Sequence, residues 1–183
     1  MKKYELTAEF IEKWGKKLFR IKALISFGSV EAGELGGYVE KEDNLAQNGN
    51  AWVCDDAEVY GNARVFGNAE VCGNARVFGN ARVCDDARVF GNAEVFDDAD
   101  YLLIGRIGSR FSFTTFFKNK DKGITVSCGC FLGTIAEFRA KVTDTHGNNK
   151  HAKMYNLAAD MAELQILGEE HFDKLNTNKS EPF

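Results

Sequence analysis

The sequence predicts a mainly β protein whose short strands coil into a solenoid, and three observations carry this prediction. Alanine recurs every six residues from Ala51 to Ala99, and valine recurs in the same register from Val53 to Val95. Six is not a helical period, because residues six apart lie on different faces of an α-helix. An even spacing suits strands with alternating side chains, and the intervening Gly-Asn or Asp-Asp pairs supply corners. Stacked units of this kind bury the valines and alanines inside a solenoid.

The repeats of residues 51–104 resemble the hexapeptide-repeat left-handed parallel β-helix family, in which three six-residue units form one triangular coil. The resemblance implies that residues eighteen apart stack about 4.8 Å from one another. The chain departs from the family pattern at the position after valine, which carries aromatic residues or cysteine instead of a small residue. Cys54 and Cys72 stack in this register, and we expect them to be surface side chains rather than metal ligands.

An aromatic ladder follows from the same register, because Tyr60, Phe78 and Phe96 are eighteen residues apart. Three stacked outward-facing aromatic rings form an apolar patch of the kind that marks an interface. The ladder therefore predicts a homo-oligomer, a dimer or a trimer. The alternative is that the N-terminal helix or the C-terminal unit of the same chain covers it.

Composition and charge suggest a reduced environment and two modules of opposite sign. The chain of 183 residues contains five cysteines, an odd number without framework spacing, which predicts reduced thiols and a cytoplasmic location. Neither an apolar signal core nor an apolar run of membrane-spanning length is present in the sequence, so no association with a membrane is expected.

The charge is divided unevenly along the chain. Residues 51–104 hold four Arg against ten acids, a charge of −6, whereas residues 105–153 hold nine Lys or Arg against three acids, a charge of +6. The basic module is the better place for an anionic ligand.

The segments outside the repeats are expected to close the solenoid at both ends. Residues 1–50 are predicted to form an N-terminal cap and first coil, with an amphipathic helix over 7–17 that starts at Thr7 and a strand over 19–27. The C-terminal predictions are a small α+β unit over 105–172, strands over 111–117 and 124–128, helices over 133–144 and 149–168, and a flexible tail over 173–183.

A second resemblance covers nearly the whole chain. Besides the repeats, the segments Gly-Gly-Tyr-Val-Glu, Ile-Gly-Ser-Arg, Ser-Cys-Gly-Cys-Phe-Leu-Gly-Thr and Thr-His-Gly-Asn-Asn-Lys-His are similar to those of uncharacterised hexapeptide-repeat proteins of phage and prophage genomes. This resemblance implies an origin in a mobile element, and therefore a location in the cytoplasm of a bacterial host cell. It carries no established activity.

The basic module contains the candidate ligand site. In the stretch of residues 105–110, two glycines let backbone N–H groups converge, and side chains add donors suited to phosphate. A fold that brings the two ends of this module together would form one site from Arg106, Ser109, Arg110, Lys118, His146, Asn149, Lys150 and His151. A sharp turn with two solvated arginines is an equally good interpretation.

Catalytic and metal chemistry are not favoured by the repeats. The first histidine is His146, so the coils supply no imidazole for acid–base catalysis, and no catalytic residue is assigned. Cys128 and Cys130 with His146 and His151 would form an imperfect metal set, and ordinary packed thiols are the better interpretation. The Asp-Asp pairs at 55/56, 85/86 and 97/98 are interpreted as turn residues, so neither a metal nor a cofactor is expected.

These observations lead to a functional hypothesis with two alternatives. The chain is expected to be a non-enzymatic binding protein of phage origin that inhibits a bacterial defence component. Its partner would be a defence protein such as a CRISPR effector, or a small anionic nucleotide signal; extended nucleic acid is disfavoured because the acidic repeats would repel it. The alternatives are a hexapeptide-repeat acyltransferase that uses His146 or His151, and a structural phage protein.

Overall fold

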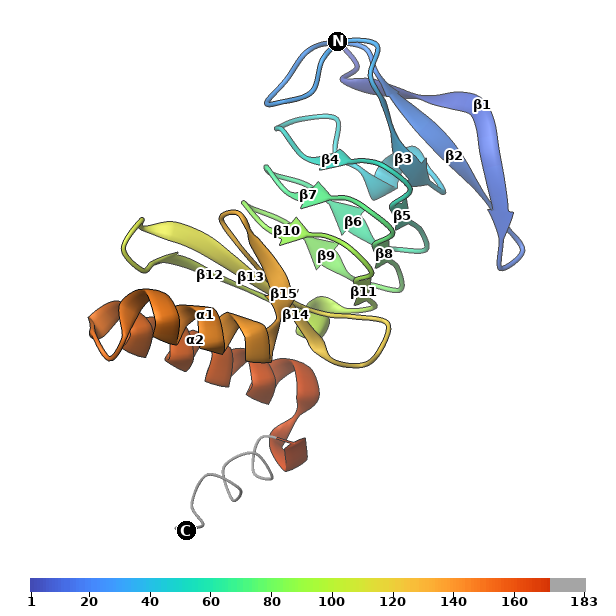
Figure 1. Cartoon of the computed structure of the whole chain (residues 1–183). Coiled ribbons are helices and arrows are strands. Elements are labelled where there is room, and N and C mark those ends of the chain that lie inside the picture. The colour runs from blue at the N-terminus through green and yellow to red at the C-terminus, as the bar shows by residue number, and fades with distance from the viewer. Residues whose placement is uncertain (172–183) are drawn as a thin grey trace. The chain divides into compact units, whose positions relative to one another are not determined.

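The computed structural model describes residues 1–171, and within them the chain forms two compact units (Figure 1). The first unit is Met1–Asp98, and the second begins at Ala99. Within residues 1–171, no helix combines the length and the apolarity needed to cross a membrane. The tail predicted for residues 173–183 lies outside the described residues.

The first unit is a β-solenoid built from two-residue strands that begin at six-residue intervals. The strands from residue 52 to residue 77 each pair in parallel with the strand eighteen residues further on, for example Trp52 with Glu70 and Glu70 with Arg88. Figure 1 shows the strands stacked in layers. The predicted solenoid and its eighteen-residue coil are confirmed. The strands are β4 (Trp52–Val53), β5 (Glu58–Val59), β6 (Arg64–Val65), β7 (Glu70–Val71), β8 (Arg76–Val77), β9 (Arg82–Val83), β10 (Arg88–Val89) and β11 (Glu94–Val95).

The interior of the solenoid consists of the repeated alanine and valine side chains, all of which are buried from Ala51 to Val95. The corners are polar and stack as well. The Asn50 amide donates to Asn68 across 3.2 Å, and the Asn62 amide donates to Asn80 across 3.1 Å. The coils thus repeat the same apolar interior, and these corner asparagines form hydrogen bonds from one coil to the next.

The N-terminal segment is a β-hairpin, so the helix predicted over residues 7–17 is wrong. Strand β1 (Tyr4–Lys13) pairs antiparallel with β2 (Lys16–Ala23). Trp14 and Gly15 join them, both with positive φ (51° and 71°), as a two-residue hairpin turn requires. Thr7, expected to cap a helix, instead accepts a hydrogen bond from the Glu9 N–H within the irregular part of β1. Pairing with β2 outweighs the helical spacing of Phe10, Ile11 and Trp14, because it satisfies the backbone along a whole sheet edge.

The hairpin is continuous with the solenoid through β3 (Leu35–Val39). This strand pairs antiparallel with β2 and parallel with β5, where Tyr38 lies opposite Glu58. A short 3-10 helix (Glu42–Asn44) follows, and Leu45 then bridges to Val65. Residues before Ala51 therefore supply the first coil as well as the cap.

Two buried N-terminal side chains anchor the cap to the first coil. The Lys3 ammonium donates to the Ala51 carbonyl across 2.8 Å and lies 4.8 Å from the centre of the Phe27 ring. The Tyr4 hydroxyl donates to the carbonyl oxygens of Glu42 and Leu45, at 2.9 and 2.8 Å. Burial lowers the pKa of Lys3 to about 8 and raises the pKa of Tyr4, which the nearby acids raise further.

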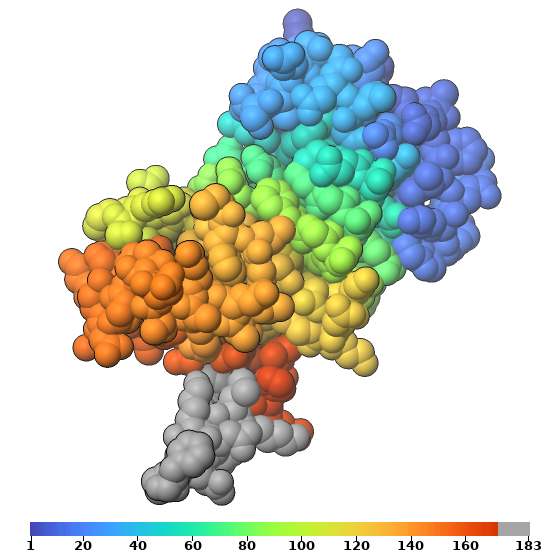
Figure 2. Space-filling view, in the orientation of Figure 1, coloured from blue at the N-terminus to red at the C-terminus, as the bar shows by residue number. Residues whose placement is uncertain are grey.

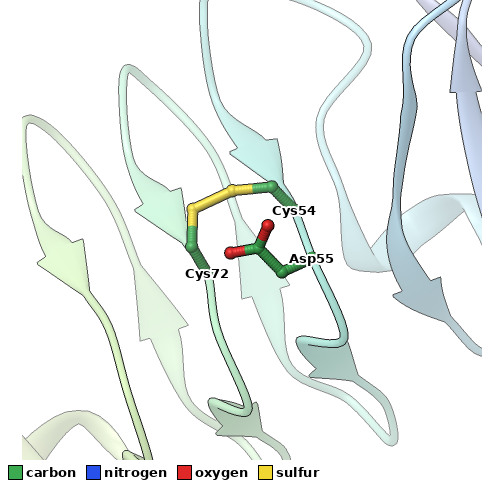
Figure 3. Close-up of side chains that lie close together, drawn as sticks. All are labelled: Cys54, Asp55 and Cys72. Atoms are coloured by element: carbon green, nitrogen blue, oxygen red, sulfur yellow. A yellow bond between two sulfur atoms is a disulfide. The ribbon is translucent and has the colours of Figure 1, made fainter.

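One pair of cysteines is oxidised, which corrects the expectation that all five are reduced thiols. Cys54 and Cys72 follow β4 and β7 at equivalent positions of consecutive coils, and their sulfur atoms form a disulfide (Figure 3). The parallel pairing of β4 with β7 brings their Cα atoms to 4.7 Å, a separation that permits the bond. The stacking of these two residues was predictable, whereas their bond was not.

The second unit has the predicted α+β composition, with two strands that the sequence analysis missed. Its sheet has the order β12 (Tyr101–Ile107), β13 (Ser112–Lys118), β14 (Ile124–Cys128) and β15 (Phe131–Thr134), all antiparallel. Helices α1 (Ile135–His146) and α2 (Lys150–Leu167) confirm the two predicted helices. Thr134 and Glu137 form a capping box at α1, which ends β15 and starts the helix. Strands β12 and β15 were missed because each directly adjoins a segment with a different pattern, the last repeat or the helix.

The buried Lys3 predicts that the stability of the protein rises between about pH 8 and pH 10. The pKa of Lys3 is about 8 in the folded protein and about 10.5 when unfolded, so the unfolded chain binds more protons in this range. Tyr4 acts in the opposite direction only above about pH 10, since its folded pKa is the higher one. Urea unfolding followed by tryptophan fluorescence should show an increase of about 1–2 kcal/mol. The Lys3→Met variant should lose this increase; the same pH profile in both proteins would contradict the assignment.

Candidate functional site

The second unit contains a pocket of about 360 Å³ between the sheet and the helices. Helix α1 supplies one wall of the pocket, and the turn after β12 and the end of β14 supply other walls. In Figure 2, α1 forms part of the orange surface. The pocket is lined by Ser109, Arg110, Ser112, Cys128, Gly129, Phe131, Phe138, Lys141, Val142, Thr145, His146 and Tyr155.

Three of the eight predicted ligand-binding residues meet in this pocket. Ser109 and Arg110 come from the turn between β12 and β13, and His146 comes from the last turn of α1. His151 lies next to His146, with 5.9 Å between the ring centres. The predicted convergence of the two ends of the basic module therefore occurs for these residues.

The other four predicted residues have separate roles. The Arg106 guanidinium lies 5.9 Å from the centre of the Phe113 ring. Lys118 forms an ion pair with Asp100 at 2.8 Å, and the Asn149 side chain caps α2 by accepting from the His151 and Ala152 N–H groups. Lys150 is exposed at the first position of α2.

The pocket combines cationic side chains with an apolar floor. Arg110 and Lys141 are exposed cations on two sides of it, and Lys141 has Asp144 as a neighbour at 3.5 Å. Phe138 and Val142 are buried and provide apolar surface at its base. Such a site suits a small molecule that carries negative charge on an apolar or aromatic body.

Tyr155 and Cys128 form a polar cluster on one side of the pocket. Burial and, to a smaller extent, the neighbouring Cys128 sulfur together raise the pKa of Tyr155 to about 12. Thr114 Oγ1 lies 3.2 Å from the Cys128 sulfur, and the His146 ring stacks on Tyr155 at 5.8 Å. These contacts fix the orientation of the tyrosine and of the histidine ring.

Sequence reasoning missed Lys141 and Thr145, although a signal for both was present. They share a helical face with Phe138, Val142 and His146, at the spacing of three and four residues that defines one side of a helix. Cys128 was interpreted only as an ordinary packed thiol, and no site role was predicted for Tyr155. Their convergence depends on how α2 packs on the sheet.

The Cys-x-Cys pair is split by the turn that joins β14 to β15. Cys128 is half-buried and lines the pocket, whereas Cys130 is exposed. In residues 1–171, the group of three metal-ligand side chains that the structure brings together is Cys54, Asp55 and Cys72, on the solenoid.

The predicted aromatic ladder forms, and the N-terminal hairpin covers one end of it. The Tyr60 and Phe78 rings stack at 5.2 Å, and Phe78 contacts Phe96 edge-on at 5.4 Å. Trp14 stacks on Tyr60 at 5.0 Å and leaves it 7% exposed, whereas Phe96 is 51% exposed. The cover predicted as an alternative exists at Tyr60, although it is a hairpin and not a helix.

The charged side chains beside the ladder alternate in sign along the stack. Arg76 pairs with Glu94 at 2.6 Å and donates to the Tyr60 hydroxyl across 3.0 Å. Glu58 pairs with Lys13 of the hairpin. Ion pairs thus connect the hairpin and successive coils on this face.

A comparison with protein-family models matches part of the solenoid. Residues 69–85 match a family model described as a YdcK beta solenoid repeat. A comparison with curated proteins found no relative of this chain. The match supports a β-solenoid and concerns none of the residues that line the pocket.

The contact between Gly108 and Tyr155 predicts that Gly108→Ala destabilises the second unit. Gly108 has φ +74°, and a Cβ atom there would collide with the Tyr155 hydroxyl. Gly147→Ala is the matched control, since Gly147 also has positive φ (+53°) but has open space around it. The control should lose about 1–3 kcal/mol from backbone strain, and Gly108→Ala should lose about 1–3 kcal/mol more from overpacking. Equal losses in thermal unfolding would show that Tyr155 does not pack against this turn.

Proposed function

We propose that this chain is a non-enzymatic binding protein that holds a small anionic ligand in the pocket of its second unit. One observation carries the proposal: Arg110, Lys141 and His146 meet around an apolar floor in a pocket of about 360 Å³. Arginine and lysine bind phosphate or carboxylate groups, and the phenylalanine and valine surface accepts a planar or apolar body.

The proposed ligand class is a single nucleotide-sized molecule. The pocket volume is at the small end of the range for small-molecule sites, about 300–1,000 Å³, which suits one nucleotide better than an extended chain. The net charge of +6 over residues 105–153 supports an anionic ligand.

The biological setting is part of the same proposal. We infer an origin in a phage or prophage, a left-handed solenoid of the hexapeptide type, and a role in inhibiting a bacterial defence component by withholding a nucleotide signal. The six-residue spacing of alanine and valine supports the hexapeptide type. Alternatively, the chain would inhibit the defence component by binding a defence protein such as a CRISPR effector.

The proposal predicts that nucleotide binding depends on the phosphate group and on Arg110. In isothermal titration calorimetry, a panel of nucleoside monophosphates should include a ligand that binds about tenfold or more tightly than its nucleoside, because charge-assisted hydrogen bonds contribute about 1.5–3 kcal/mol. Arg110→Ala should abolish that difference. Arg106→Ala is the matched control, since this arginine lies four residues away and outside the pocket lining.

Three results would contradict the binding proposal. They are no binding across the panel, equal affinity for a nucleotide and its nucleoside, or equal losses in Arg106→Ala and Arg110→Ala. Lys141→Ala and Lys150→Ala form a second matched pair on the two helices, and the proposal requires the larger loss in Lys141→Ala.

An acyltransferase remains the second candidate, favoured by the position of one histidine. His146 lines the pocket beside Tyr155 and could serve as a general base toward a bound acceptor. Release of free thiol from acyl-CoA, lost in His146→Asn and retained in Lys150→Ala, would favour this function over simple binding.

We also propose a homo-oligomer in which the exposed end of the aromatic ladder contributes to the interface. Phe96 is half-exposed beside the half-buried Phe78, so a charged residue there should disfavour association. Phe96→Glu should lower the mass measured by light scattering, and Phe111→Glu, at an exposed phenylalanine of the second unit, should not. A monomeric wild-type protein would refute the oligomer.

A further inference from the structure

The solenoid brings two cysteines and one aspartate together at a corner, far in sequence from the pocket residues. The sulfur atoms of Cys54 and Cys72 and a carboxylate oxygen of Asp55 all lie within 4.8 Å of one another (Figure 3). Both cysteines are partly accessible, and Asp55 is exposed. An ion from solution could therefore reach all three side chains.

The spacing of the coils suits a shared metal ion once the disulfide is reduced. The two Cα atoms are 4.7 Å apart, and both side chains leave the same position of consecutive coils. Two thiolates bound to one tetrahedral Zn²⁺ at about 2.3 Å each have sulfur atoms about 3.8 Å apart. Side chains that run parallel from this backbone spacing can meet that separation without a change of fold.

The backbone positions the Asp55 carboxylate beside the sulfur atoms. One of its oxygens accepts a hydrogen bond from the Gly73 N–H across 2.9 Å, which leaves the other oxygen available as a ligand. Asp56, the next residue, instead faces the Arg20 guanidinium at 3.6 Å. The two adjacent aspartates therefore have different roles.

Asp55 also occupies a corner position where most repeats have glycine. Its φ is +55°, and the corresponding glycines, such as Gly61, Gly67 and Gly73, have φ of +71° to +76°. Residues other than glycine cost about 1–2 kcal/mol in this conformation, and aspartate is one of the few that adopt it.

We propose that Cys54, Cys72 and Asp55 form a binding site for a thiophilic divalent cation of the Zn²⁺ type in the reduced protein. A dithiol or phosphine reductant supplies two electrons, and two protons are taken up, to convert the disulfide into two thiols. The metal ion then displaces both thiol protons and binds two thiolates and one carboxylate, with water in the fourth position. The charge of −6 over residues 51–104 favours a cation at this site.

The chain contains an internal control for this site. The sequence Cys-Asp-Asp occurs at residues 54–56 and again at 84–86, and Asp85 has the same positive φ as Asp55 (57° and 55°). The residue eighteen before Cys84 is Phe66, and the residue eighteen after it is Leu102. The second motif therefore has the local sequence and corner of the first, but no cysteine at the same position of a neighbouring coil.

Cobalt titration of the full chain tests the proposal. The protein is reduced with a phosphine, freed of reductant without air, and titrated with Co²⁺, whose thiolate charge-transfer and tetrahedral ligand-field bands report sulfur ligation. Addition of Zn²⁺ should displace the cobalt and remove the bands. The wild type should bind one equivalent of Co²⁺ with these bands, and Cys72→Ser should lose them.

Asp55→Gly tests the carboxylate without a risk to folding, because glycine is the usual residue at these corners. It should weaken Co²⁺ binding about 10- to 100-fold, whereas Asp56→Asn, Asp85→Gly and Cys84→Ser should bind as the wild type does. The Cys128→Ser/Cys130→Ser variant should also retain the bands. The proposal is overturned if the reduced wild type gives no bands, if Cys72→Ser retains them, or if they depend on Cys128 and Cys130.

Discussion

The structure of the first unit depends on the parallel pairing of each coil with the next, eighteen residues further along the chain. This pairing satisfies the backbone N–H and C=O groups and places equivalent positions of the repeat above one another. The register of this pairing therefore decides which side chains are buried and which are stacked throughout the solenoid. The same stacking that buries the valines also brings the corner asparagines, the aromatic rings, the alternating charges and the two cysteines together.

The N-terminal end of the stack is covered by the first residues of the chain. The first coil continues into an antiparallel hairpin, and the Lys3 and Tyr4 side chains donate hydrogen bonds to backbone carbonyl groups near the start of the repeats. A buried ammonium is tolerated there because two backbone carbonyls and the Phe27 ring surround it. The hairpin also lays Trp14 on Tyr60, so that the cap and the aromatic ladder form one continuous surface.

The second unit follows another principle, in which a four-stranded sheet packs against two helices. Its core includes Phe116, Val126, Phe138 and Ala159, which come from both layers. The pocket arises where the turn after β12, the end of β14 and the last turns of α1 converge. The two candidate sites thus have separate origins: side-chain repetition in the solenoid, and packing of unlike elements in the second unit.

The sequence by itself determined the solenoid, the eighteen-residue coil and the two C-terminal helices, because each is encoded in a local period of apolar residues. It also identified Ser109, Arg110 and His146 as possible neighbours, from charge and residue type. Only the tertiary structure decided that residues 4–23 form a hairpin, since strand pairing between distant segments outweighs a short helical spacing. It likewise decided that Lys118 pairs with Asp100, that Lys141 and Tyr155 line the pocket, and that Cys54 and Cys72 bond. Each of these contacts depends on the distance between residues far apart in the chain, which no local pattern records.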